Sequence, residues 1–110
     1  MTATEKPLVW LHGEVRTPPF SRDARVEAGY LLRRLQRGEK LMMPQSRPMG
    51  TIGRRCHELR IRDDDHLWRI VYRIDHDAIV ILEVFDKDSR ETSEYVKAIC
   101  RRRLKRYDDA

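Results

Sequence analysis

Apolar residues along this chain follow two spacings, and the wider one predicts two helices. In residues 22–37 and 92–107 the apolar positions lie three to four residues apart, which is the period of an amphipathic helix. Ser21 can cap the first helix, and Thr92 or Ser93 can cap the second. The apolar positions of the first are Val26, Tyr30, Leu31 and Leu35. Those of the second are Tyr95, Val96, Ile99, Cys100 and Leu104.

Shorter segments with strand chemistry lie before and between these helices. Residues 8–12 form a short apolar run that predicts a first strand. Three further strands are predicted at 56–62, 67–74 and 78–85, joined by Asp-rich separators that suit tight hairpin turns. Residues 42–53 contain two prolines and two glycines and predict a surface loop. The order predicts a small α+β fold over 1–110, with an antiparallel or mixed sheet of four strands and both helices packed on one face.

Alternation along the two central strands separates an apolar face from a basic one. The apolar set expected in the core is Leu59, Ile61, Trp68, Ile70 and Tyr72. The opposite face carries Arg60, Arg62, Arg69 and Arg73 beside Glu58, with Arg54 and Arg55 before it and Arg90 after it. Such a row is either the solvated side of a half-buried sheet or an anion-binding surface. Because nearly every charge in it is an arginine, binding to phosphate is the sharper interpretation.

The charge balance agrees with an anionic partner. Lys and Arg total 23 against 18 Asp and Glu, which gives a formal net charge of +5 and favours nucleic acid. A length of 110 residues excludes a multidomain enzyme. The chain begins without an apolar signal segment, so a cytoplasmic location with no membrane association is expected. In that compartment Cys56 and Cys100 should be reduced and buried.

Several motifs resemble the HigB-like, phage-related branch of the RelE/ParE toxin superfamily. They are Cys-His-Glu-Leu-Arg-Ile-Arg-Asp at 56–63, Trp-Arg-Ile-Val-Tyr at 68–72, residues 79–85 followed by Lys87, and the closing Arg-Leu-Lys at 103–105. The similarity covers about residues 7–107. It implies a small toxin of a type II toxin–antitoxin system that cleaves messenger RNA in the ribosome. It also implies a cognate antitoxin, expected to carry a helix-turn-helix DNA-binding domain.

The resemblance also implies which side chains form the site. By strand position, Arg60 and Arg69 correspond to the residues that bind the scissile phosphate, and Lys87 matches the first lysine of the family's Phe-x-Lys-Lys-Thr stretch. Asp88 stands where the family has the second lysine. The RNA-binding candidates are Arg54, Arg55, Arg62, Arg73 and Arg90.

Cleavage of this kind needs a base for the 2′-hydroxyl, an acid for the leaving oxygen and cations for the phosphorane. Glu58 is a candidate base or, preferably, an orienter of Arg60, while His57 is a candidate acid or base whose strand position faces the core. Neither a metal nor a cofactor is expected, because no ligand set has suitable spacing.

The sequence is compatible with two classes of function. One is a metal-independent endoribonuclease, and the other is a non-catalytic binding module on the same fold, with a ParE-like gyrase inhibitor as a third possibility. Arg69 is expected to project from an exposed face of a central strand, so Arg69→Ala should lower the cleavage rate about a hundredfold and change stability by about 0.5 kcal/mol or less.

Overall fold

The computed structural model describes residues 5–11, 20–86 and 92–110. Within them the chain forms a five-stranded sheet and two helices, which confirms the small α+β fold. In chain order the elements are β1 (Leu8–Trp10), α1 (Arg22–Gln36), β2 (Ser46–Pro48), β3 (Cys56–Asp63), β4 (His66–Ile74), β5 (Ile79–Asp86) and α2 (Glu94–Asp109).

The sheet is mixed, with strand order β1-β5-β4-β3-β2. Strands β2 to β5 pair antiparallel, while β1 runs parallel to β5. The loop predicted over residues 42–53 contains β2, which sequence analysis missed. Its Pro48 is tolerated because β2 is an edge strand, where a missing N–H removes no ladder bond.

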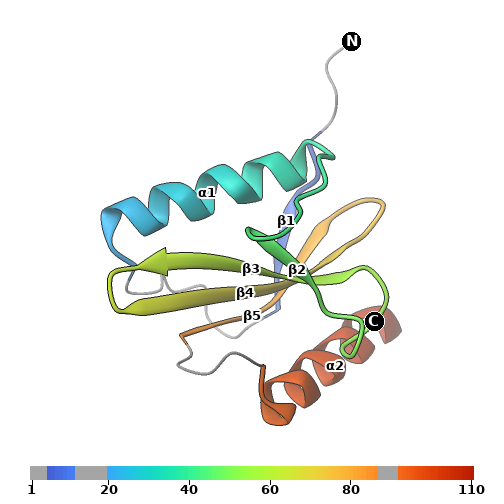
Figure 1. Cartoon of the computed structure of the whole chain (residues 1–110). Helices are drawn as coiled ribbons and strands as arrows, with labels where there is room; N and C mark the ends of the chain where they lie inside the picture. Colours follow the sequence, from blue (N-terminus) through green and yellow to red (C-terminus); the bar gives the residue numbers. More distant parts are fainter. Residues whose placement is uncertain (1–4, 12–19, 87–91) are drawn as a thin grey trace.

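The two helices cover opposite faces of the sheet, as Figure 1 shows. The prediction that both pack on one face is therefore wrong. Strand β5 explains why, since Ile79 and Ile81 join the core beneath α1 while Val80 and Leu82 join a second cluster beneath α2. A strand that is apolar on both sides needs cover on both sides.

The α1 helix begins at the predicted residue and ends one residue before the predicted boundary, but its buried face is different. Val26 and Tyr30, expected in the core, are 65% and 61% exposed. Ala24 and Ala28 lie against the sheet in their place, together with Leu31, Leu32 and Leu35. The buried side of α1 therefore combines two alanines with three leucines.

A polar contact fixes the start of α1 against the β3–β4 hairpin. The Ser21 Oγ atom accepts a hydrogen bond from the Ala24 N–H at 3.1 Å and so caps the helix. The Ser21 N–H and the Trp68 indole N–H both donate to Asp63, at 2.8 and 3.2 Å. Hydrogen bonding from the Ser21 side chain, from the Ser21 N–H and from Trp68 holds the pKa of the Asp63 carboxyl below its usual range.

Two further expectations concern the cysteines and the membrane. Cys56 and Cys100 are both free and buried, as predicted. Desolvation raises the pKa of the Cys56 thiol to about 11 and that of the Cys100 thiol to about 12. Neither helix in the described ranges is long and apolar enough to cross a membrane.

Candidate nucleic-acid interface

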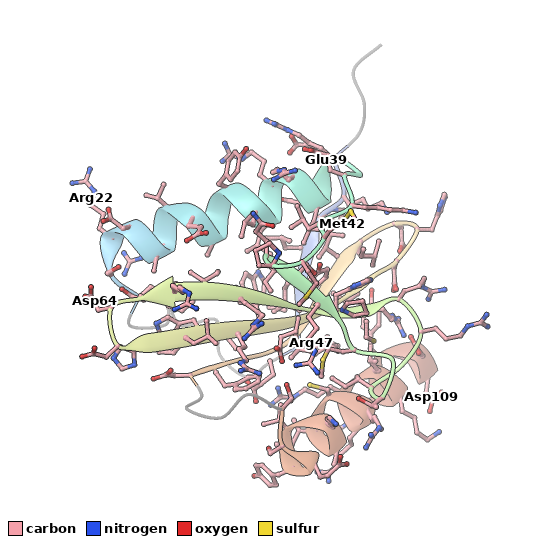
Figure 2. The ribbon with its side chains drawn as sticks, in the orientation of Figure 1. Arg22, Glu39, Met42, Arg47, Asp64 and Asp109 are labelled. Atoms are coloured by element: carbon pink, nitrogen blue, oxygen red, sulfur yellow. The ribbon has the colours of Figure 1, made fainter. Side chains whose placement is uncertain are left out.

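The predicted basic residues of the central strands do share one face of the sheet. In the antiparallel register Arg60 lies opposite Arg69, and Glu58 lies opposite Val71 and Arg47. Paired residues project to the same side of a sheet. We call this surface the arginine face; its five arginines are Arg47, Arg60, Arg62, Arg69 and Arg73. Figure 2 shows Arg47 on the α2 side of the sheet.

Helix α2 covers much of the arginine face, so the arginines differ greatly in exposure. Beneath the helix, Val71, Val80 and Leu82 pack with Cys100 and Leu104. The row is therefore not simply the solvated side of a half-buried sheet. Arg69 is 0% exposed and Arg73 is 9% exposed, whereas Arg60 is half-buried and Arg62 is exposed.

A buried ion pair forms the centre of this face. The Arg69 guanidinium donates to the Glu58 carboxylate at 3.1 Å, and both side chains are at most 1% exposed. The Thr92 hydroxyl, just before α2, donates to the other Glu58 oxygen. Glu58 was preferred as an orienter of Arg60, but its carboxylate binds and positions Arg69 instead. The expected small stability effect of Arg69→Ala assumed an exposed side chain, and its burial contradicts that assumption.

The end of the face nearest the β3–β4 turn is open. Arg60 and Arg62 line a depression of about 360 Å³ with Leu67 opposite Arg62, and its other walls are Glu27, Pro44 and Gln45. Within the described residues neither arginine forms an ion pair, and the Arg60 Nε atom is buried without a hydrogen-bond partner. Among the described residues this end therefore presents two guanidinium groups without an ion-pair partner, in a depression whose walls are apolar at Pro44 and Leu67 and acidic at Glu27.

The opposite end of the face is internally neutralised. Arg73 donates to Asp75 at 2.6 and 2.8 Å and to Asp108, on the last turn of α2, at 2.9 and 2.7 Å. These contacts raise the pKa of Arg73 and hold the pKa of the Asp108 carboxyl below its ordinary value. Arg73 therefore anchors the C-terminal part of α2 to the sheet.

The predicted RNA-binding set is divided between these two ends. Arg73 lies opposite Cys56, six residues along β3 from Arg62, which corresponds to about 20 Å at roughly 3.3 Å per residue. The exposed Arg54 and Arg55 immediately precede Cys56 and so belong to the Arg73 end. Arg55 lies 3.6 Å from Asp75 and has a positive φ of 63°. Lys87 and Arg90 lie outside the described residues.

His57 is not part of the arginine face. It projects to the α1 side, as alternation predicts, where its ring stacks on Tyr72 with centroids 5.5 Å apart. It is half-buried and lies opposite Pro48 of β2. Desolvation lowers the pKa of His57, so the ring is neutral at physiological pH.

Thr92 is the site residue that sequence reasoning assigned a different role. It was a candidate helix cap, but Ser93 is the cap, accepting from the Val96 N–H at 3.2 Å. Thr92 is instead 5% exposed and bound to Glu58. The sequence signal for this role was the pair of adjacent hydroxyl residues, Thr92 and Ser93. One helix cap needs only one hydroxyl, so the other was available for a different contact.

Comparison with known proteins identifies the chain by its sequence family. A family model described as phage derived protein Gp49-like (DUF891) matches residues 19–105. Among curated proteins and solved structures, no significant match is found.

Proposed function

The chain belongs to the Gp49-like family of phage-derived proteins, which is associated with RelE-like toxins, and we propose that it is the HigB-like toxin of a type II toxin–antitoxin pair. In this proposal it cleaves messenger RNA in the ribosome and so arrests translation. Its expected location is the cytoplasm, and it uses neither a metal nor a cofactor.

The observation that carries the proposal is the open end of the arginine face. Arg60 and Arg62 stand on a rigid strand, free of ion pairs within the described residues, beside a depression of about 360 Å³. A guanidinium matches the geometry of phosphate oxygens, and strand β3 fixes the backbone from which each of these two projects. The depression offers an apolar wall at Leu67 and Pro44 against which a flanking base can rest.

The proposed chemistry is attack of a ribose 2′-oxygen on the adjacent phosphate, with departure of the 5′-oxygen. Arg60 stabilises the charge that develops on the phosphorane, and Arg62 binds the strand. Arg69 lies opposite Arg60 and is fixed by Glu58, so this neutral pair acts as a structural support for the strands that carry Arg60. The resemblance to HigB-like toxins adds Lys87 as a further catalytic cation.

A test of this function is induced expression with growth measurement and mapping of RNA 5′ ends within minutes. Wild-type protein should arrest growth and generate new 5′ ends inside coding sequences. Arg60→Ala should lower cleavage about a hundredfold, as loss of one charge-stabilising donor does. Arg60→Lys should recover part of it, because charge remains but the bidentate geometry is lost. The matched control is Arg22→Ala, which removes an exposed arginine at the start of α1.

The second candidate function is a non-catalytic binding module or a ParE-like gyrase inhibitor. The observation that favours it is the burial of Arg69 and Glu58, which removes both from direct contact with a substrate. Growth arrest without new RNA ends, accompanied by gyrase–DNA cleavage complexes, would support the gyrase inhibitor. Absence of arrest together with tight antitoxin binding would support the binding module.

The proposed partner is an antitoxin with a helix-turn-helix domain encoded beside this gene. The toxin-associated family and the net charge of +5 both support an acidic neutralising partner. Expression of the full operon with a tag on this chain should co-purify that protein and abolish growth arrest. Recovery of the tagged chain alone, still toxic, would contradict it.

A further inference from the structure

Helix α2 presents a second basic surface on the side turned away from the sheet. Tyr95 is 76% exposed, and Arg102 and Arg106 are exposed as well. Residues seven and eleven positions apart return to nearly the same side of an α-helix. Tyr95, Arg102 and Arg106 therefore form one row, which we call the α2 ridge.

The arginines of the α2 ridge differ from the other basic residues of this helix. Arg101 donates to the Thr51 carbonyl at 3.0 and 2.7 Å, and Arg103 donates to the Leu82 carbonyl at 2.5 Å and lies 3.3 Å from Glu83. The lysines form pairs within the helix, Lys97 with Glu94 and Lys105 with Asp109. Among the described residues, no ion pair involves Arg102 or Arg106. Their charges are available to an outside ligand.

A hollow extends the ridge toward β1. Arg106 and Arg103 line a depression of about 410 Å³ together with Tyr107 and Leu11. Arg103 is held to β5 by its two contacts, so one wall of this hollow is rigid. A strand lying along the ridge would meet cations both on the ridge and at this hollow.

The other end of the ridge adjoins the arginine face. Thr92 binds the buried Glu58, and Tyr95 follows it by three residues in the first turn of α2. A rise of about 1.5 Å per residue places Arg106 roughly 16 Å farther along the helix. The ridge thus lies on the same side of the sheet as the proposed cleavage site and leads away from it.

We propose that the α2 ridge is an accessory binding surface for single-stranded RNA, with Tyr95 stacking on a base and Arg102 and Arg106 binding phosphates. This inference rests on the proposed function. An exposed aromatic ring interleaved with unpaired cations is the combination that single-strand binding surfaces use. A partner helix would instead require an apolar stripe, and Tyr95 is the one large apolar residue on the ridge.

The test is binding of a fluorescein-labelled 12-nucleotide oligouridine by anisotropy, with 2′-O-methyl sugars so that it cannot be cleaved. In Arg102→Ala/Arg106→Ala the slope of log affinity against log salt should fall by about 1.4, since each single-strand phosphate contact contributes about 0.7. Tyr95→Ala should weaken binding about tenfold at constant salt slope. The control is Arg22→Ala/Arg25→Ala, which removes the same charge from exposed positions on α1, across the sheet from α2.

Three outcomes of the anisotropy measurement would overturn the inference. They are no binding of the probe by wild-type protein, wild-type binding by the Arg102/Arg106 variant, and equal weakening by the α1 control. Loss of antitoxin binding with unchanged RNA binding would also overturn it and would mark the ridge as a protein contact. Thermal melts should be unchanged in all these variants because the side chains are exposed. Growth arrest and 5′-end mapping judge the proposed function separately.

Discussion

The buried pair of Arg69 and Glu58 should be the point where this fold is least tolerant of substitution. Removing one partner of a buried ion pair leaves the other charged and desolvated, which costs about 3–5 kcal/mol. Arg69→Ala and Glu58→Ala should each show a loss of this size, because both side chains are at most 1% exposed. Total stabilities of small domains are only about 5–15 kcal/mol. At about 4 °C per kcal/mol, the melting temperature should fall by about 12–20 °C.

The measurement is urea unfolding followed by tryptophan fluorescence, since Trp68 lies in the core beneath α1. The control is Arg62→Ala on the same face, whose exposed side chain should change stability by about 0.5 kcal/mol or less. The double variant Glu58→Met/Arg69→Met should recover most or all of the loss, because apolar residues of similar volume can replace a buried pair. If Arg69→Ala and Arg62→Ala were equally mild, the pair would not be a closed, desolvated contact.

Three further predictions follow from individual contacts. The hydrogen bond between His66 and Asp86 raises the pKa of His66. The pair should therefore stabilise the fold fully below about pH 6.5, and this contribution should be lost as the pH rises through the raised pKa. Melting temperatures of wild type and His66→Gln should converge at alkaline pH. Cys56 and Cys100 should resist alkylation at pH 8 until urea unfolds the protein, because burial raises both thiol pKa values to about 11 and about 12. Gly38 has a φ of +91° just after α1, so Gly38→Ala should cost about 1–2 kcal/mol in thermal melts.

Elements with a local signal were predictable to within one or two residues. The bounds of β3 and β4 follow from alternation and from the Asp-rich turns beside them, which depend only on neighbours in the chain. Strand β2 has three residues and exists because Ser46 and Arg47 pair with β3. A segment that short has no period of its own, so its pairing partner had to be known first.

Which residues of β3 and β4 share a face was predictable, but their burial was not. Alternation placed Arg60 opposite Arg69 on one face, and the register agrees. Whether that face is exposed to solvent depends on where α2 packs. The contact that places α2 joins Thr92 to Glu58, which are 34 positions apart in the sequence. The helix period of α1 was equally ambiguous, because leucines and alanines on one side compete with Val26 and Tyr30 on the other.

The double-sided apolar character of β5 decides where positive charge remains on the sheet. Because Val80 and Leu82 need cover, α2 must lie over the arginine face, and any arginine beneath it needs a carboxylate. Glu58 forms an ion pair with Arg69, and Asp75 and Asp108 both form ion pairs with Arg73, so these charges cancel within the protein. Along β3 and β4, uncompensated charge is left where the helix does not reach, at Arg60 and Arg62. An anionic chain approaching this side of the molecule therefore meets, among the described residues of these two strands, unpaired guanidinium groups at Arg60 and Arg62, whereas Arg69 and Arg73 are already paired with carboxylates.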